Sequence, residues 1–277
     1  MTLNGKRRPC HGHGNRLYFA SGWQEKLKEI GLIQGCRWDE LEPGEIVTRS
    51  KRTNAYKVTL DDGETVFFKR YLLFGKPYKF YLRPSEPTVE VYSYKVMAKL
   101  GIPIAEPLAL GEIRRFGSLF AACIVTRGVP DTISLSKYAA QEWLLLPREL
   151  QEEAFLTISS TICRHLQTIH AAGFFHFDAK WRNILVQRDQ SGKVEGIWWI
   201  DSPRGRKLPA WRHEYGIVHD LADLCRLALS FLTRSQRLRF LHSYYGPRTT
   251  RKELKRVVRK INRHLQRVPP KVIKPTK

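Results

Sequence analysis

Four side chains in the second half of the chain have the types and spacing that transfer of a phosphoryl group requires. Asp178, Lys180 and Asn183 lie in the stretch LQTIHAAGFFHFDAKWRNILV, residues 166–186, and Asp201 ends the later run GIWWID. A carboxylate can accept the proton of an attacking hydroxyl group, and amide and carboxylate oxygens are suitable ligands for Mg²⁺. A lysine beside the base could offset the negative charge that grows on the transferring group.

The elements expected around these residues would hold them on one loop. Apolar residues recur with helical spacing over 148–172, and a strand is expected to begin at Ile184. The pattern His176-x-Asp178-x-x-x-x-Asn183 therefore falls on a loop between a helix and a strand. Its spacing matches the catalytic loop of kinases, in which an Asp reaches the acceptor hydroxyl and an Asn turns back to hold a metal ion.

A second pair of charged side chains lies in the strand-rich first half. Lys69 belongs to the strand VFFKRY, where alternation points it away from the face of Phe68 and Arg70. The next element is a helix over 86–100, which Ser85 caps and which carries Glu90. An ion pair between Lys69 and Glu90 would hold the ammonium group over the α- and β-phosphates of a nucleotide.

Each of these features also has a simpler interpretation. A single His-x-Asp-x-x-x-x-Asn pattern is common, and a lone strand lysine or helix glutamate is usually a solvated surface residue. Asp201, which precedes Ser-Pro, could cap a turn. The order of the features favours the kinase interpretation, because chance rarely places the lysine strand, glutamate helix, catalytic loop, hairpin and aspartate in succession.

The composition limits the classes of protein that the chain can belong to. Its 48 Lys and Arg against 26 Asp and Glu give a formal net charge of +22, which indicates a polyanionic partner such as nucleic acid, a phosphorylated glycan or an anionic lipid surface. No apolar run is long enough to span a bilayer, and the N-terminus lacks the apolar core of a signal peptide. The 5 scattered cysteines are typical of reduced cytosolic thiols.

The chain resembles the lipopolysaccharide kinases of the Kdo/WaaP type, which are related to the InaA proteins. The resemblance runs from about Trp38 to Gly246. Its most specific stretches are VFFKRY, the helix of Glu90 that leads into KLGIPIAEPLALGE, the block at 166–186, and VHDLADLCRLALSFL followed by FLHSYYG.

This resemblance implies an α+β, protein-kinase-like fold with two lobes. The small, β-rich N-lobe is expected over 17–128 with the one key helix 86–100, and the larger, helical C-lobe over 129–268. A disordered basic tail is expected at 1–16 and a second tail at 269–277.

The same likeness implies a role for each candidate residue. Asp178 would be the catalytic base, supported by Lys180, while Asp220 would be a buried carboxylate that binds the catalytic loop and His176 a packing residue. The segment Ile124–Gly128 resembles the hinge that holds adenine. The residues expected to bind ATP are Lys69, Glu90, Thr126, Gly128, Asn183 and Asp201, and the last two of these would hold Mg²⁺.

The chain departs from the protein-kinase pattern in two ways. Its first hairpin has no Gly-x-Gly-x-x-Gly, so that Ser50, Lys51 or Arg52 would have to help cover the phosphates. Only 18 residues separate Asp201 from Asp220, which leaves little room for a phosphorylated activation loop or a peptide-docking platform. This argues against a protein substrate.

The expected function is ATP- and Mg²⁺-dependent phosphorylation of a sugar hydroxyl, on Kdo or heptose, in the lipopolysaccharide inner core. The acceptor would be the core or a lipid A-linked glycan, and the protein would lie on the cytoplasmic face of the inner membrane, bound to its anionic surface. The basic helix at 251–267 could lie with its apolar face at the lipid headgroups, or could pack that face on the C-lobe and leave its charges solvated.

Other functions also fit parts of the sequence. A kinase of the same fold could act on another small molecule or on a protein. A basic, nucleic-acid-binding pseudokinase would explain the charge, although no aromatic and basic residues interleave as in RNA-recognition motifs, and no nucleic acid partner is expected. Cys10, His11 and His13 could hold a metal, but three ligands in a tail are a weak pattern.

Overall fold

The computed structural model describes residues 13–50, 53–72 and 77–267 of the chain. The predicted C-terminal tail at 269–277 and residues 1–12 of the predicted N-terminal tail lie outside the described residues, and so do Lys51 and Arg52. None of the helices in the described ranges combines the length and the apolar character that crossing a membrane requires.

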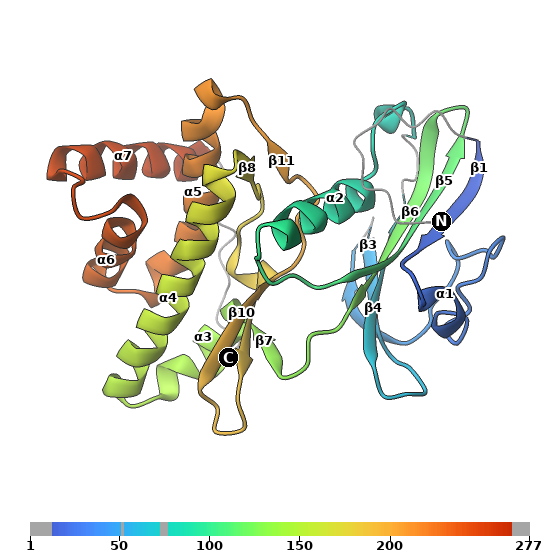
Figure 1. Cartoon of the computed structure of the whole chain (residues 1–277), viewed down its shortest axis with the longest axis horizontal. Coiled ribbons are helices and arrows are strands. Elements are labelled where there is room, and N and C mark those ends of the chain that lie inside the picture. Colours follow the sequence, from blue (N-terminus) through green and yellow to red (C-terminus); the bar gives the residue numbers. More distant parts are fainter. Residues whose placement is uncertain (1–12, 51–52, 73–76, 268–277) are drawn as a thin grey trace. The chain divides into compact units, whose positions relative to one another are not determined.

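Contacts between residues divide the chain into two compact units (Figure 1). Unit 1 comprises Met1–Pro130 together with Ser202–Arg204, and unit 2 comprises Asp131–Asp201 together with Gly205–Lys277. Unit 1 is built on a large β-sheet and unit 2 mainly on helices (Figure 1). The predicted α+β class is therefore confirmed.

Unit 1 contains a six-stranded antiparallel sheet in the order β1-β5-β6-β4-β3-β2. Two helices and a 3₁₀ turn accompany it. The elements are β1 (Gly14–Phe19), α1 (Trp23–Lys26), β2 (Glu45–Arg49), β3 (Thr53–Thr59), β4 (Thr65–Leu72), η1 (Pro77–Phe80), α2 (Glu86–Lys99), β5 (Pro107–Arg115) and β6 (Ser118–Arg127).

Strand β1 corrects the end of the predicted disordered tail, because residues 14–16 belong to the sheet. Gly14 to Arg16 pair with β5, and the Asn15 side chain donates to the carbonyl of Cys36 at 2.8 Å. Only Leu17 and Phe19 of this edge strand are buried, so its polar first half shows no hydrophobic pattern. The pairing with β5, which lies far along the sequence, decides this strand.

Each face of the sheet has its own hydrophobic core, because side chains alternate along β4. Phe68 lies on one face and packs with Trp38 and the residues around α1. Tyr71 lies on the other face and packs with Val91 and Tyr94 of α2. Lys69 shares the parity of Tyr71, so it lies on the face that α2 covers.

A buried ion pair fixes the start of α2. The Ser85 hydroxyl accepts from the Thr88 amide at 3.1 Å, as the sequence predicts for the helix cap. The Thr88 hydroxyl donates to Glu112 at 2.7 Å, and Glu112 in turn accepts from Arg114 Nε at 2.9 Å. Because a buried charge is stable only with such partners, this network ties the first turn of α2 to β5.

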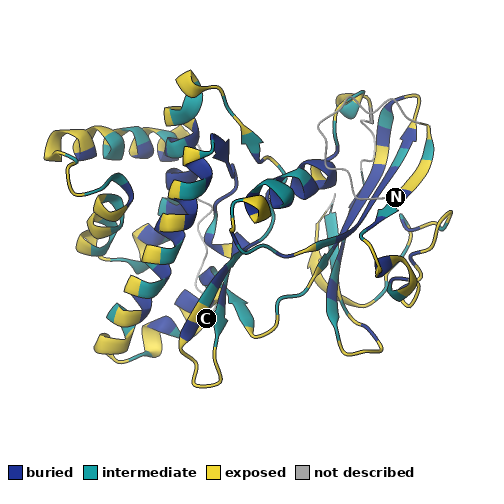
Figure 2. Cartoon of the chain, viewed as in Figure 1, coloured by how far each residue is buried: buried dark blue, intermediate teal, exposed yellow. Residues whose placement is uncertain are grey.

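Unit 2 consists of a helical bundle with two small antiparallel sheets, ordered β10-β9-β7 and β11-β8. Figure 2 shows buried residues along one side of its long helix α4. The elements are β7 (Thr132–Ser134), α3 (Leu135–Gln141), η2 (Trp143–Leu145), α4 (Arg148–Ala171), β8 (Phe174–Phe175), η3 (Trp181–Asn183), β9 (Ile184–Arg188), β10 (Val194–Trp199), β11 (Arg206–Lys207), η4 (Ala210–Arg212), α5 (His213–Phe231), α6 (Arg234–Tyr245) and α7 (Arg251–Arg267).

Helix α5 begins at His213, earlier than the start at Asp220 that the sequence predicts. Gly216 lies in the first turns of α5, and because glycine has a low helix propensity, the sequence pattern does not indicate a helix there. A Cβ atom at Gly216 would lie 2.3 Å from the Phe175 ring, so the close approach of α5 to β8 requires glycine there. Helix α1 is also shorter than the predicted helix at 24–33, and turns follow it.

Candidate active site

One buried carboxylate binds the backbone of the candidate catalytic loop. Asp220, in α5, accepts hydrogen bonds from the backbone N–H groups of His176 at 2.8 Å and Phe177 at 2.7 Å. The ring of His170, at the end of α4, donates to the same carboxylate at 3.1 Å. These contacts confirm the predicted structural role of Asp220.

The electrostatics of this anchor favour the ionised carboxylate. Burial alone would raise the pKa of Asp220, but the hydrogen bond and the charge of His170, with the contacts from His176, outweigh burial and lower the pKa. Phe177 adopts a left-handed φ of 59°, which is costly for a bulky residue. The two amides bound to Asp220 hold this turn, which presents the following residue, Asp178.

Three of the predicted site residues, Asp178, Lys180 and Asn183, contact one another in unit 2. The Lys180 ammonium group pairs with Asp178 Oδ1. The Asn183 amide donates to Asp178 Oδ2 at 2.8 Å and to the Asp178 carbonyl at 2.9 Å. Asp178 is 6% exposed, and these contacts hold both oxygens of its carboxylate.

Asn183 also contacts the backbone of Asp201, which lies in the same unit. The Asn183 side-chain nitrogen also donates to the Asp201 carbonyl at 3.4 Å, which leaves the Oδ1 atom of Asn183 as an acceptor on the other side of the amide. Asp201 follows β10 with a left-handed φ of 56°. Within the described ranges, no three His, Cys, Asp or Glu side chains gather as a metal site. An amide and a carboxylate oxygen nevertheless fit Mg²⁺, which usually completes its shell with phosphates and water.

Lys69 and Glu90 lie together in unit 1. Their charged groups, Nζ and Oε2, are 3.8 Å apart, which is an ion-pair distance. Glu90 is 1% exposed and accepts from the Tyr94 hydroxyl at 2.9 Å and the Tyr71 hydroxyl at 3.4 Å. The two tyrosines fix the carboxylate on α2, so Lys69 has a rigid partner.

The predicted hinge segment ends β6. Thr126 pairs with Phe67 of β4 and with Pro107 of β5. The Gly128 amide donates to the Thr65 carbonyl at 2.7 Å, and a Cβ atom at Gly128 would lie 2.9 Å from that oxygen. Glycine is therefore required by the close approach of two strands, and its amide is engaged within unit 1.

Sequence reasoning missed one contact next to the candidate metal ligands. The Ser93 hydroxyl, one turn after Glu90 on α2, donates to the carbonyl of Ser202 at 2.9 Å. Ser202 directly follows Asp201, and Ser202–Arg204 belong to unit 1. A helical serine usually bonds to its own helix, as Ser93 also does with Val89, so the sequence carries no signal for this contact.

Two buried histidines, His165 of α4 and His176 of the candidate catalytic loop, lie near Trp199. Burial lowers the pKa of His165 to about 4, and its Nδ1 atom accepts from the Trp199 indole at 3.0 Å. Burial also lowers the pKa of His176, against the opposing effect of Asp220 and other carboxylates, and its ring lies 5.1 Å from the Trp199 ring. The predicted packing role of His176 agrees with this placement.

The comparisons with known proteins identify the family and the fold. The model of the lipopolysaccharide kinase (Kdo/WaaP) family matches residues 73–245, more than half of the chain. The chain therefore belongs to this family, which is one of phosphotransferases. Membership implies the use of ATP and a divalent metal ion.

A solved structure shows the same fold. The structure described as WaaP in complex with acyl carrier protein aligns with a TM-score of 0.64 and 19% identity, and the match covers 92% of this chain and 99% of that one. No curated protein matches the sequence. The predicted protein-kinase-like fold is confirmed.

Acid should destabilise unit 2 through His165. An unfolded histidine has a pKa near 6.5 and the folded one a pKa of about 4, so the unfolded state binds the proton first as the pH falls. The stability that His165 contributes is complete above about pH 6.5 and is lost toward pH 4, by about 3 kcal/mol. Urea unfolding followed by tryptophan fluorescence at pH 7 and pH 4.5 measures this loss.

The matched variants are His165→Asn, which keeps an acceptor for Trp199, and His242→Asn on the exposed side of α6. His165→Asn should be less sensitive to acid than the wild type, and His242→Asn should match the wild type. Equal acid sensitivity of all three proteins would show that His165 does not titrate as described.

Proposed function

We propose that this protein is an ATP- and Mg²⁺-dependent kinase that phosphorylates a sugar hydroxyl, on Kdo or heptose, in the lipopolysaccharide inner core. Family membership supports the reaction class. The observation that carries the proposal is the group formed by Asp178, Lys180 and Asn183 on the loop anchored by Asp220, next to the backbone of Asp201 after β10.

Asp178 is the proposed base. Its carboxylate would accept, or orient, the proton of the sugar hydroxyl as the oxygen attacks the γ-phosphorus atom and the bond to the leaving oxygen breaks. Lys180, already paired with Asp178, would turn toward the transferring group and offset its charge. Most of the rate enhancement would come from positioning, which the fixed carboxylate supports.

Asn183 Oδ1 and the Asp201 carboxylate would hold Mg²⁺. The ion, when bound, neutralises charge on the nucleotide phosphates. Lys69, fixed by Glu90, would bind the α- and β-phosphates. Because the amides of Arg127 and Gly128 are engaged with Glu106 and Thr65, the segment that includes Thr126 and Gly128 would offer carbonyl oxygens to adenine.

The variant Asp178→Asn tests the proposed base. It keeps the shape of the side chain and removes the proton acceptor, so we expect phosphate transfer to deacylated inner-core glycan to fall by about 10³-fold. Mass spectrometry of the glycan measures the added phosphate, and calorimetry with an ATP analogue should show unchanged nucleotide binding.

Asp131→Asn is the matched control for this variant, because Asp131 is exposed and its left-handed φ of 54° suits asparagine. It should retain full activity. Equal turnover by Asp178→Asn and the wild type would remove Asp178 from the role of base.

We also propose that the protein binds the anionic cytoplasmic face of the inner membrane through α7. The apolar face of this helix is covered: Leu254, Ile261 and Leu265 are buried, and α7 packs on α5. Of the two arrangements expected from the sequence, packing of this face within unit 2 is therefore the one observed. The cations on the opposite, exposed side are Arg251, Lys252, Lys255, Arg256, Arg259, Arg263 and Arg267.

At about 100° per residue, the seven exposed cations occupy an arc of about 160° around α7. Glu253 is the one exposed acid on the helix, and it accepts from the amide and hydroxyl of Thr250 at its start. The helix therefore presents positive charge without an apolar anchor, which suits purely electrostatic binding to anionic headgroups.

Reversing two charges on α7 tests this surface. The double variant Arg256→Glu with Arg259→Glu should weaken binding to anionic vesicles by at least about 30-fold, since each cation near such a surface contributes about 1 kcal/mol. Salt should release the wild type, because screening weakens exposed charges. Co-sedimentation with vesicles measures both effects.

The control for α7 changes charge by the same amount elsewhere: Lys137→Glu on α3 with Arg164→Glu on α4, both exposed. It should bind nearly as the wild type does. Equal weakening by the two double variants would indicate a response to net charge alone, and binding that resists salt would contradict the electrostatic mode.

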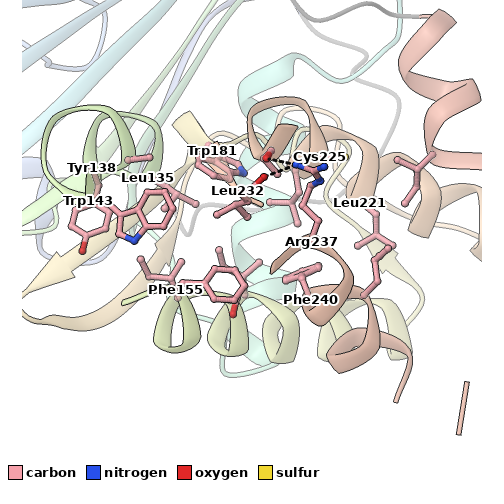
Figure 3. Close-up of a pocket in the computed structure, with 18 residues that line it drawn as sticks. Leu135, Tyr138, Trp143, Phe155, Trp181, Leu221, Cys225, Leu232, Arg237 and Phe240 are labelled. Atoms are coloured by element: carbon pink, nitrogen blue, oxygen red, sulfur yellow. Dashed lines mark hydrogen bonds between the residues drawn. The ribbon is translucent and has the colours of Figure 1, made fainter. Parts of the chain in front are cut away.

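An apolar pocket in unit 2 supports a further partner, an acyl carrier protein. The solved WaaP structure is a complex with acyl carrier protein. The pocket here has a volume of about 130 Å³ and lies between α3, α4, α5 and α6 (Figure 3). Arg237 is its one charged lining residue, and its guanidinium group donates to the backbone of Leu232 and Ala228 (Figure 3). We propose that an acyl chain enters this pocket.

The neighbouring serines of α4 allow a matched test of the acyl site. Ser159 lines the pocket and Ser160 is exposed outside it. Ser159→Phe should fill the cavity and abolish the increase in melting temperature that an acylated carrier protein gives, whereas Ser160→Phe should keep it. An equal increase with unacylated carrier protein would contradict a site for the chain.

A further inference from the structure

Two aromatic side chains and an arginine form an exposed cluster on η4 and the first turns of α5. Trp211 is 82% exposed and Tyr215 is 47% exposed. The Arg212 guanidinium carbon lies 5.6 Å from the Trp211 ring centroid and 5.4 Å from that of Tyr215. A fold gains little from leaving two large rings in water, so a clustered pair around a cation indicates a binding surface.

This cluster is joined to the catalytic loop through packed rings. The Tyr215 ring lies 6.0 Å from the Phe177 ring, and the Arg206 guanidinium carbon lies 4.2 Å from the centroid of the same Phe177 ring. Phe177 is the residue directly before Asp178, the proposed base. The exposed rings of the cluster therefore stand close to the loop on which a hydroxyl acceptor would react.

The segment that carries the cluster is held rigidly in unit 2. Strand β11 pairs Arg206 with Phe175 of β8, and the Leu208 amide donates to the Gly173 carbonyl at 3.0 Å. The ring of His213 donates to the Leu208 carbonyl at 3.0 Å. Since both ends of the segment are fixed, Trp211 and Arg212 are positioned before any ligand binds.

The charges nearby select an anionic ligand. Residues 205–213 contain Arg206, Lys207 and Arg212 and no acidic residue. The next acid, Glu214, pairs with Lys260 of α7. A guanidinium group binds a carboxylate or phosphate through two parallel hydrogen bonds, while an indole ring packs against the apolar C–H face of a sugar ring.

We propose that Trp211, Arg212 and Tyr215 form the subsite that binds the acceptor, a sugar ring that carries a carboxylate or a phosphate. This inference rests on the proposed function and names the residues that would recognise its substrate. Trp211 and Tyr215 contact the ring of the sugar and Arg212 binds its anionic group, so the hydroxyl that reacts is presented to Asp178.

Steady-state kinetics with deacylated inner-core glycan test the subsite. Trp211→Ala should raise the KM for the glycan by about tenfold or more and leave the KM for ATP and kcat nearly unchanged. Arg212→Gln should raise the glycan KM in the same way. Leu145→Ala, at a side chain that is 81% exposed on η2, and Arg234→Ala, at an exposed arginine of α6, are the controls and should behave as the wild type.

Two modified glycans identify the anionic group. If Arg212 binds a carboxylate, Arg212→Gln and the wild type should have equal KM values for carboxyl-reduced glycan; if it binds a phosphate, they should be equal for phosphatase-treated glycan. Calorimetric titration of each protein with the glycan should show the same losses without turnover. A difference between the proteins that persists with both modified glycans would contradict the role of Arg212.

The failures of the two proposals can be told apart. A wild-type protein that transfers phosphate to no inner-core glycan contradicts the proposed function. A wild type that does transfer phosphate, with an unchanged glycan KM in Trp211→Ala, contradicts the subsite alone. Loss of vesicle binding by Trp211→Ala with an unchanged glycan KM would make the ring a membrane anchor and would also overturn the subsite.

Discussion

The conformation of the candidate catalytic loop depends on the hydrogen bonds that the buried carboxylate of Asp220 accepts. A fully buried charge is destabilising unless hydrogen-bond donors surround it. Here the donors are the amides of His176 and Phe177 and the ring of His170. The cost of burying the charge thus enforces one backbone path, including the left-handed turn at Phe177, and that path sets the direction of Asp178.

The need to pair buried charges also determines the position of α2 in unit 1. Glu90 and Glu112 are both buried, so each needs hydrogen-bond donors. Tyr94 and Tyr71 hold the first, and Arg114 and Thr88 hold the second. Helix α2 is consequently fixed at two points, so that the Glu90 carboxylate stays in place as the ion-pair partner of Lys69.

The basic surplus of the chain is distributed by the fold and not merely by composition. Burial of the apolar face of α7 on α5 turns its cations outward, where they can meet an extended anionic surface. The cations of the segment before α5 instead lie among aromatic rings beside the catalytic loop, as Arg206 and Arg212 do. The fold therefore places cations in two different settings, an exposed helix face and an aromatic cluster.

Local interactions explain what the sequence determined by itself. The period of apolar residues predicts α4 and α7, alternation and a cap predict β4 and α2, and the spacing around Asp178 predicts the loop, because each depends on neighbours a few residues away. Tertiary structure alone decided β1, the early start of α5 at His213, the bond from Ser93 to Ser202, and the grouping of Tyr215 with Phe177. These features depend on strand pairing, close packing or contacts between distant segments, and no local pattern of residue types encodes such contacts.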